Sequence, residues 1–265
     1  MSTYDQPRWL ALCLAGLSRQ DYPNFEVLIA DDGSADRTRR LIRAASRRSG
    51  FPIRHVWQED RGFRKCRALN ACIRVAAFDY VVFIDGDCVP REDFLSTHER
   101  LRRRNRFLSG GYYKLSASTS AQLTLDAVLS GACFEPGWPP ERGPDRARRA
   151  LKLTRSSTLA WLADTVSTAR ASWNGHNASA WREDLYRVNG FDERMGYGGE
   201  DRELGERLER LGVNGLRIRY RTPVFHLAHE RSYIDSSHPV VNARIRAEGQ
   251  RNQALRTEHG INLHQ

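Results

Sequence analysis

The sequence has very little lysine and no closely spaced pair of cysteines. Lysine occurs only at Lys65, Lys114 and Lys152, so arginine supplies almost all of the basic side chains. The five cysteines form no C-x-x-C pair and their number is odd, which argues against both a disulfide framework and a zinc site. We therefore expect reduced thiols in a cytosolic protein.

Long apolar runs are also missing. No stretch approaches the roughly 20 apolar residues of a membrane span, and "MSTYDQPRWLALC" lacks the basic start and apolar core of a secretory signal. The 265 residues, 40% of them hydrophobic, suffice for one large α/β domain or two small ones.

The charge is strongly positive, with a net value of +10 and a pI near 9.8. Such a balance suits an anionic partner: nucleic acid, an anionic membrane leaflet or a phosphorylated glycan. An arginine bias of a GC-rich genome is the alternative explanation. The sequence shows no helix-turn-helix, zinc finger or RNA-binding signature, so we expect no nucleic-acid partner.

Strand and helix patterns alternate through the first 90 residues. Residues 25–30, 51–58 and 79–87 have the apolar character of strands, and "RTRRLIRAASRR" and "RKCRALNACIRVA" between them are helical by period. This order predicts an α/β fold with a parallel, doubly wound sheet. Ligands of such sheets lie at the carboxyl ends of the strands.

Four aspartates fall at that edge of the predicted sheet. Asp31 and Asp32 end one strand, and Asp85 and Asp87 end another in "VVFIDGDCVP". An Asp-Gly turn would explain the second pair alone. A divalent metal would explain it as well, because hard cations bind carboxylate oxygens and often need few of them when phosphates supply the rest. The shared edge favours the metal.

Four stretches in this order, "VLIADDGSADRT", "FIDGDC", "GGEDRE" and "FHLAHE", resemble the GT-A-fold glycosyltransferases of family 2. The C-terminal half resembles the galactosyltransferase and chondroitin-polymerase branch, most specifically in "NGHNASAWREDLYRVNGFDERMGYGGEDRELGERL". The resemblance implies a Rossmann-like, mostly parallel central sheet flanked by helices. It also implies a catalytic domain over residues 1–232, with a nucleotide-binding half (1–90) and an acceptor-binding half (91–232). Residues 233–265 read as a polar, loosely held tail.

The resemblance assigns the nucleotide side to the first half. Thr3 and Tyr4 match a segment whose aromatic ring packs on the base, and Asp31 or Asp32 would accept a hydrogen bond from uracil N3–H. Either aspartate could instead only cap the next helix. Basic and amide side chains would lie against the diphosphate, with a solvated basic face as the alternative; they are Arg64, Lys65, Arg67 and Asn70.

The same resemblance supplies metal ligands. Asp87 would bind Mn²⁺ or Mg²⁺, while Asp85 would hold the ribose and a metal-bound water. One of His226 and His229 would be a further ligand, although a histidine on an apolar strand is more often structural. Strand alternation favours His226.

On the acceptor side, the resemblance makes Asp201 the general base and gives Glu200 an orienting role. Both open a helix, whose N-terminus favours negative charge, so we expect ionised carboxylates with a lowered pKa. The alternative is that they are merely favourable helix-start acids. Further acceptor contacts are implied for Asn174, His176, Asn177, Trp181 and Tyr197; Tyr197 could equally be a packing aromatic.

One departure from the family pattern concerns the N-terminus. Family members carry an apolar strand before the Thr-Tyr segment, whereas this chain begins at Met1, so the first strand of the sheet is expected to be missing. Either the start lies upstream or the sheet is built without that strand. Asp5 also replaces the usual asparagine.

The sequence therefore predicts a cytoplasmic, metal-dependent, inverting glycosyltransferase. Its donor would be a nucleotide diphosphate sugar, with UDP favoured, and its acceptor a glycan or glycolipid of bacterial surface polysaccharide or lipopolysaccharide. Arginines near 100–106 and 142–155 suggest peripheral docking on the inner face of the membrane. A metal-dependent nucleotidyltransferase and a non-catalytic sugar- or nucleic-acid-binding module are the alternatives.

Overall fold

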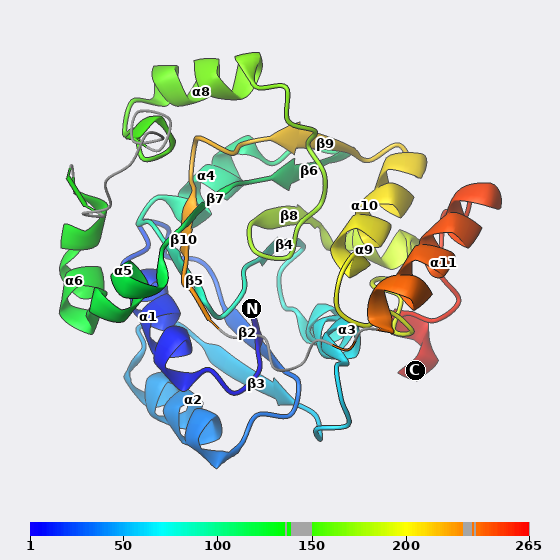
Figure 1. The fold of residues 1–265 in the computed structure, drawn as a ribbon, viewed down its shortest axis with the longest axis horizontal. Helices are drawn as coiled ribbons and strands as arrows, with labels where there is room; N and C mark the ends of the chain where they lie inside the picture. The colour runs from blue at the N-terminus through cyan, green and yellow to red at the C-terminus, as the bar shows by residue number, and fades with distance from the viewer. Residues whose placement is uncertain (136, 139–149, 230–234, 236, 265) are drawn as a thin grey trace.

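Strands and helices alternate through the first half of the chain around a parallel three-stranded sheet, as the sequence predicts. The computed structural model describes residues 1–265 except 136, 139–149, 230–234, 236 and 265 (Figure 1). The sheet order is β1-β2-β3, and each neighbouring pair is parallel. The elements of this half are β1 (Ser2–Thr3), α1 (Pro7–Ser18), β2 (Val27–Asp31), α2 (Asp36–Arg48), β3 (Ile53–Trp57) and α3 (Lys65–Val75).

The remaining strands form a mixed sheet of order β4-β8-β6-β9 and a small sheet of order β5-β10-β7. The strands are β4 (Tyr80–Phe83), β5 (Cys88–Pro90), β6 (Arg106–Ser109), β7 (Tyr112–Lys114), β8 (Ala178–Trp181), β9 (Asn214–Arg217) and β10 (Val224–His226). The helices are α4 (Phe94–Leu101), α5 (Ala117–Gln122), α6 (Leu125–Ser130), η1 (Ala132–Phe134), α8 (Ser157–Val166), α9 (Arg182–Arg187), α10 (Glu200–Arg210), α11 (His238–Arg251) and η2 (Ile261–His264).

The two larger sheets meet at β1. Ser2 forms a parallel bridge with Asp85, its amide donates to Ile84 at 3.2 Å, and its carbonyl accepts from the Gly86 amide at 2.7 Å. On the other side β1 pairs with β2. The strand that we expected to be missing is thus present as two residues, and these two occupy the central position of the fold.

Below β1 the two sheets are separated by a hollow of about 480 Å³. Met1, Leu28 of β2 and Phe83 of β4 are among the residues that line it. The Met1 amino group donates to the Leu28 carbonyl at 2.8 Å, and burial lowers its pKa. The short β1 therefore pairs the sheets only at their carboxyl ends, where the polar residues gather.

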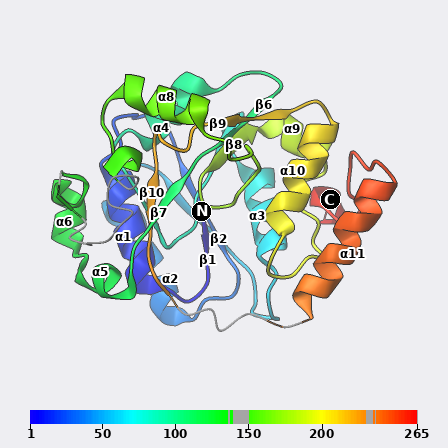
Figure 2. The same cartoon turned by 45° about the horizontal axis from the view of Figure 1, so that its top comes forward.

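The C-terminal segment differs from the expected loose tail. Ile245 of α11 and Ile261 of η2 are buried in the same apolar cluster as Leu69 and Ile73 of α3. Asn242 of α11 also bonds to both the amide and the carbonyl of Gly196. Figures 1 and 2 both show α11 alongside α10. Buried isoleucines and these hydrogen bonds hold a segment that is otherwise polar.

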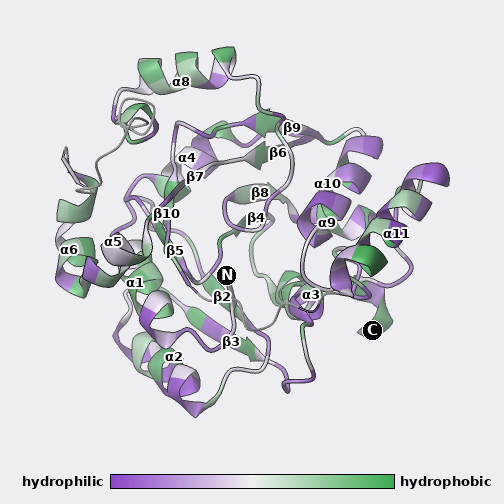
Figure 3. Cartoon of the chain, in the orientation of Figure 1, coloured by the Kyte–Doolittle hydropathy of each residue, from purple (hydrophilic) through white to green (hydrophobic). Residues whose placement is uncertain are grey.

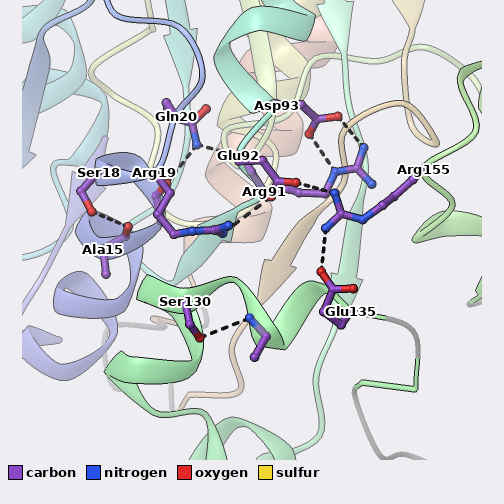
Figure 4. A network of polar contacts seen from close by, with 12 residues as sticks. Ala15, Ser18, Arg19, Gln20, Arg91, Glu92, Asp93, Ser130, Glu135 and Arg155 are labelled. Carbon is purple, nitrogen blue, oxygen red and sulfur yellow. Dashed lines mark hydrogen bonds and ion pairs between the residues drawn. The ribbon is translucent and has the colours of Figure 1, made fainter.

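A network of ion pairs joins the end of α1, the loop before α4 and the segment before α8. Glu92 lies between Arg19 at 3.6 Å and Arg155 at 2.6 Å, and Arg155 also approaches Glu135 at 3.4 Å (Figure 4). The chain just before α8 is therefore tied to the loop that precedes α4.

All five cysteines are free and buried, which agrees with the expectation of reduced thiols. Among the helices of the described residues, none has both the length and the apolar character needed to cross a membrane.

Candidate active site

A cavity of about 590 Å³ lies at the carboxyl ends of the central strands. The loops after β1, β2, β4 and β10, the start of α3 and the start of α10 all contribute to its wall. Most residues that the sequence singled out line it: Thr3, Tyr4, Asp32, Lys65, Asp85, Asp87, His176, Tyr197, Glu200, Asp201, His226 and His229. Asp31, Arg67, Asn70, Asn174, Asn177 and Trp181 do not.

The two aspartates after β2 have different environments. Asp31 is fully buried, accepts the Ser34 amide at 2.8 Å and lies 2.7 Å from Nε2 of His55. Asp32 instead lines the cavity and accepts from Gln58 at 2.6 Å and from the Arg64 amide. Burial raises the pKa of Asp32, partly offset by Gln58 and Arg64. Asp31 therefore shapes the turn, and Asp32 is the carboxylate that a ligand can reach.

Thr3 ends β1 and Tyr4 follows it, and both line the cavity. The Tyr4 hydroxyl donates to Oδ2 of Asp60 at 2.9 Å, and this hydrogen bond raises the pKa of Tyr4. This hydrogen bond holds the Tyr4 ring in the cavity wall beside Asp32. The resemblance predicts an aromatic ring there that packs on the base.

Lys65 and Asp85 form an ion pair in the cavity wall, with 2.9 Å between Nζ and Oδ1. Burial acts to raise the pKa of Asp85, but Lys65 and a 2.5 Å hydrogen bond from the Ser2 hydroxyl outweigh it and lower that pKa. Burial likewise acts to lower the pKa of Lys65, but Asp85, Asp201 and Glu200 raise it well above its usual value. Both groups are charged at neutral pH.

Two other residues of α3 depart from the predicted diphosphate contacts. Arg67 is exposed and lies outside the cavity lining. Asn70 is fully buried and bonds to the amide and the carbonyl of Phe191. Helical periodicity explains the difference, because Asn70 shares the inward face of α3 with Cys66 and Ile73.

Asp87 and two histidines make a cluster at the end of β10. Oδ2 of Asp87 is 2.6 Å from Nε2 of His229 and 3.8 Å from Nε2 of His226. Nδ1 of His226 is buried without a hydrogen-bond partner among the described residues. A carboxylate with one or two imidazoles fits a divalent cation. Cys88 also lies near, but burial raises the pKa of its thiol well above the usual value, so the cluster holds no thiolate.

Glu200 and Asp201 open α10 after the left-handed Gly199, as predicted, but their electrostatics differ from the expectation. Burial raises the pKa of Asp201 to about 7, and Glu200 and Asp85 add to this against the attraction of Lys65. The prediction that the helix N-terminus keeps the pKa of Asp201 low is wrong, because burial outweighs the helix dipole. Glu200 is buried and accepts from the Gly198 amide at 2.8 Å.

The predicted acceptor residues divide into two groups. His176 and Tyr197 line the cavity, and burial lowers the pKa of His176 to about 4, so this imidazole is neutral. Asn177 is fully buried and donates to the Gly111 and Thr222 carbonyls, which makes it structural. Asn174 accepts from the Asn177 amide and shapes the same loop.

Trp181 lies away from the cavity. It pairs with Tyr80 at the far end of β8, and Arg102 and Arg104 stack on its ring at 5.2 and 4.0 Å. The antiparallel pairing of β8 with β4 places Trp181 at the end of the sheet opposite Asp85.

Among the cavity residues that the sequence predictions did not include are Asp60, Phe63 and His238. The Phe63 ring centroid lies 5.9 Å from those of both Tyr197 and His238. The aromatic Phe63 after "EDRG" was a visible signal, whereas nothing marked His238 in a region read as a tail.

Comparison with known proteins agrees with this geometry. Residues 1–116 match the family described as glycosyl transferase family 2, and residues 169–230 match the N-terminal domain of galactosyltransferase. A validoxylamine A glucosyltransferase of Streptomyces hygroscopicus subsp. jinggangensis is 30% identical over 237 residues, which cover 80% of this chain and 50% of the relative. The chondroitin synthase of Escherichia coli is 27% identical over 221 residues, covering 79% and 32%. This chain thus spans half or less of the length of these relatives.

Solved structures share the fold at low sequence identity. TarS of S. aureus in complex with UDP-GlcNAc superposes with a TM-score of 0.63 at 14% identity, covering 96% of this chain and 68% of that one. The mannosyltransferase PcManGT of Pyrobaculum calidifontis, in complex with GDP-Man and Mn²⁺, has a TM-score of 0.59 at 20% identity and covers 96% and 70%. Residues 1–116 therefore match the family 2 glycosyltransferases, and the chain has the GT-A fold of these solved structures.

Proposed function

We propose that this protein transfers a sugar from a nucleotide diphosphate donor to a hydroxyl group of a glycan or glycolipid, in one inverting displacement. One observation carries the proposal. A single cavity places a hydrogen-bond acceptor (Asp32), a half-buried cation (Lys65) and a carboxylate of near-neutral pKa (Asp201) around one volume. These are the groups that base recognition, a diphosphate leaving group and a deprotonated acceptor require.

The nucleotide would lie across β1. Asp32 can accept a hydrogen bond from uracil N3–H, which favours UDP over a base that offers only acceptors there. Tyr4 would pack on the base, and Asp85 would hold the ribose beyond it. Lys65 brings a positive charge to the diphosphate, and its own ion pair with Asp85 holds it in place.

Asp87 with His226 or His229 would hold a divalent cation, Mn²⁺ or Mg²⁺. When bound, the cation neutralises the leaving diphosphate and helps to orient it. His229 lies nearer than His226 to the Asp87 carboxylate, so we assign His229 a role at least equal to that of His226.

Asp201 would take the proton of the acceptor hydroxyl. A general base works best when its pKa lies near the operating pH, and the pKa of about 7 meets this condition. Oδ1 of Asp201 is buried and has no hydrogen-bond partner among the described residues, so it is ready to accept one. Glu200 would orient the acceptor, and Tyr197 would contact its sugar ring.

The acceptor would belong to a bacterial surface polysaccharide or lipopolysaccharide. The names of the relatives support a glycan, since they include chondroitin and hyaluronan synthases. Residues 1–90 would then form the nucleotide-binding half and residues 91–232 the acceptor-binding half.

Calorimetric titration of UDP, GDP and CMP, each with and without Mn²⁺, tests the proposal. We expect UDP to bind, more tightly with Mn²⁺, and Asp87→Ala to remove the effect of the metal. Glu206→Gln, on the outer part of α10, should keep both. Binding of none of the three nucleotides, with or without metal, would contradict the proposed donor site.

A further inference from the structure

Helix α8 exposes its apolar side to solvent and buries its charged residue. Its large apolar side chains face solvent: Leu159 is 50% exposed, Trp161 53%, Leu162 48% and Val166 70%. Its one charged residue, Asp164, is buried. A surface helix of a globular protein normally presents the opposite pattern.

The contacts of Asp164 fix this orientation. Oδ1 accepts from the Tyr220 amide at 3.2 Å, and Oδ2 lies 3.3 Å from Nε of Arg221. Ala160 and Ala163, on the same side of the helix, are buried with it. Turning α8 to bury its leucines would expose these alanines and break the buried ion pair, so the apolar side is held outward.

The outward side therefore forms a strip with four large apolar residues and no charge. Ser157, Thr158 and Thr165 are the only other residues on it, and all three are neutral. Figure 1 shows α8 at the top of the molecule, set apart from the sheets, and Figure 3 colours much of it as hydrophobic. Exposed apolar patches of this kind mark interaction sites.

Positive charge lies next to the strip at Arg217. Arg217 donates to the carbonyls of Ser167 and Ala169, just beyond the end of α8, and has no carboxylate within ion-pair distance among the described residues. In the sequence, the segment before α8 is rich in basic residues: Arg142, Arg146, Arg148, Arg149, Lys152 and Arg155. Of these, Arg142 to Arg149 lie outside the described residues. The whole chain has a net charge of +10.

We propose that the outward side of α8 inserts into the headgroup region of an anionic lipid bilayer. An apolar strip that contains tryptophan, beside excess positive charge, fits the boundary between acyl chains and anionic headgroups. The basic charge provides long-range attraction, and Leu159, Trp161, Leu162 and Val166 provide the apolar contact. This site goes beyond the proposed sugar transfer and does not depend on it.

Flotation with vesicles tests the proposal without any sugar substrate. The protein is mixed with phosphatidylcholine vesicles, with and without phosphatidylglycerol, at physiological salt. We expect binding to the anionic vesicles, reduced at least roughly tenfold by Leu162→Asp, because the variant puts a charge where apolar contact is needed. Val240→Asp on α11, at a side chain 72% exposed, is the matched control and should bind as the parent does.

Trp161 supplies a second readout. Subtracting the emission of Trp161→Phe isolates its fluorescence, which should shift to shorter wavelength with anionic vesicles. Three results would overturn the proposal: no flotation of the parent protein, equal flotation of Leu162→Asp, or equal binding to purely neutral vesicles. A dimer in sedimentation that Leu162→Asp dissociates would also overturn it, since a second copy would then cover the strip. Unchanged thermal unfolding of the variants excludes misfolding as the cause.

Discussion

Replacing the proposed general base should stabilise the fold. In the unfolded chain Asp201 loses its proton near the ordinary pKa of 3.8, whereas burial raises that pKa to about 7 in the folded chain. Between these values the folded state binds more protons than the unfolded state. The free energy of unfolding therefore falls as pH rises through this window, and the cost is fully present above pH 7.

The size of the effect follows from the two pKa values. A difference of about three pH units, at 1.36 kcal/mol each, corresponds to about 4 kcal/mol near pH 8. Asp201 keeps some contact with solvent in the cavity, which screens part of this cost, so we expect about 2–4 kcal/mol. Asp201→Asn has nearly the same shape and carries no charge. It should gain this amount near pH 8 and little near pH 4, where the native carboxyl is already protonated.

Urea unfolding at both pH values, with a chelator present, measures the gain. Asp36→Asn provides the control, because Asp36 lies in the first turn of α2 but is well exposed. Its free energy of unfolding should change by less than about 1 kcal/mol, and similarly at both pH values. If Asp201→Asn were no more stable than the parent near pH 8, or gained equally at both pH values, the burial argument would be refuted.

Three further predictions concern other charges of the site and core. Lys65→Met should weaken UDP binding at least roughly tenfold by removing a half-buried cation from the proposed diphosphate site, while Arg67→Met, at an exposed side chain, should not; calorimetry compares the two variants. Asp31→Asn should lower the free energy of unfolding by about 1–3 kcal/mol, whereas Asp32→Asn should mainly weaken UDP binding, so the reverse pattern would exchange their roles. Arg207→Met should cost about 3–5 kcal/mol in urea unfolding, because it leaves a buried carboxylate unpaired; a loss below about 1 kcal/mol would contradict this.

The sequence predicts the α/β order and the edge where the cavity lies, because short apolar runs followed by polar residues specify both. It could not predict the hollow below β1, which depends on how two sheets are spaced. It also missed the packing of the described part of the C-terminal segment, residues 237–263. Ile245 and Ile261 anchor that segment, and two apolar residues in a polar stretch give no periodic signal.

Within the site, motif positions were more reliable than the roles of individual side chains. Asp31 and Asp32 are adjacent in sequence, so only the surrounding contacts show which one a ligand can reach. Asn70 matched a motif, yet the helical period already placed it on the buried face of α3. The position of Trp181 depends on the strand order. Because β8 runs antiparallel to β4, the last residue of β8 lies at the end of the sheet away from the cavity.

The charge state of Asp201 illustrates a different limit. A position at a helix start favours a carboxylate, and this local rule pointed to a low pKa. The opposing effect is burial in the folded chain, to which repulsion from the adjacent Glu200 and from the distant-in-sequence Asp85 adds. Local sequence patterns therefore identify Asp201 as a candidate base but do not predict its protonation state.

The bridge at Ser2 has a mechanical consequence. Asp32 follows the sheet on one side of β1, whereas Asp201 opens a helix that packs on β9 of the sheet on the other side. Ser2 pairs with both sheets, so the angle between the sheets at β1 helps to set the distance between these carboxylates. A donor that contacts both Asp32 and Asp85 would span β1 and touch both sheets. The proposed donor site is thus assembled from two sheets, and β1 is the seam at which they are joined.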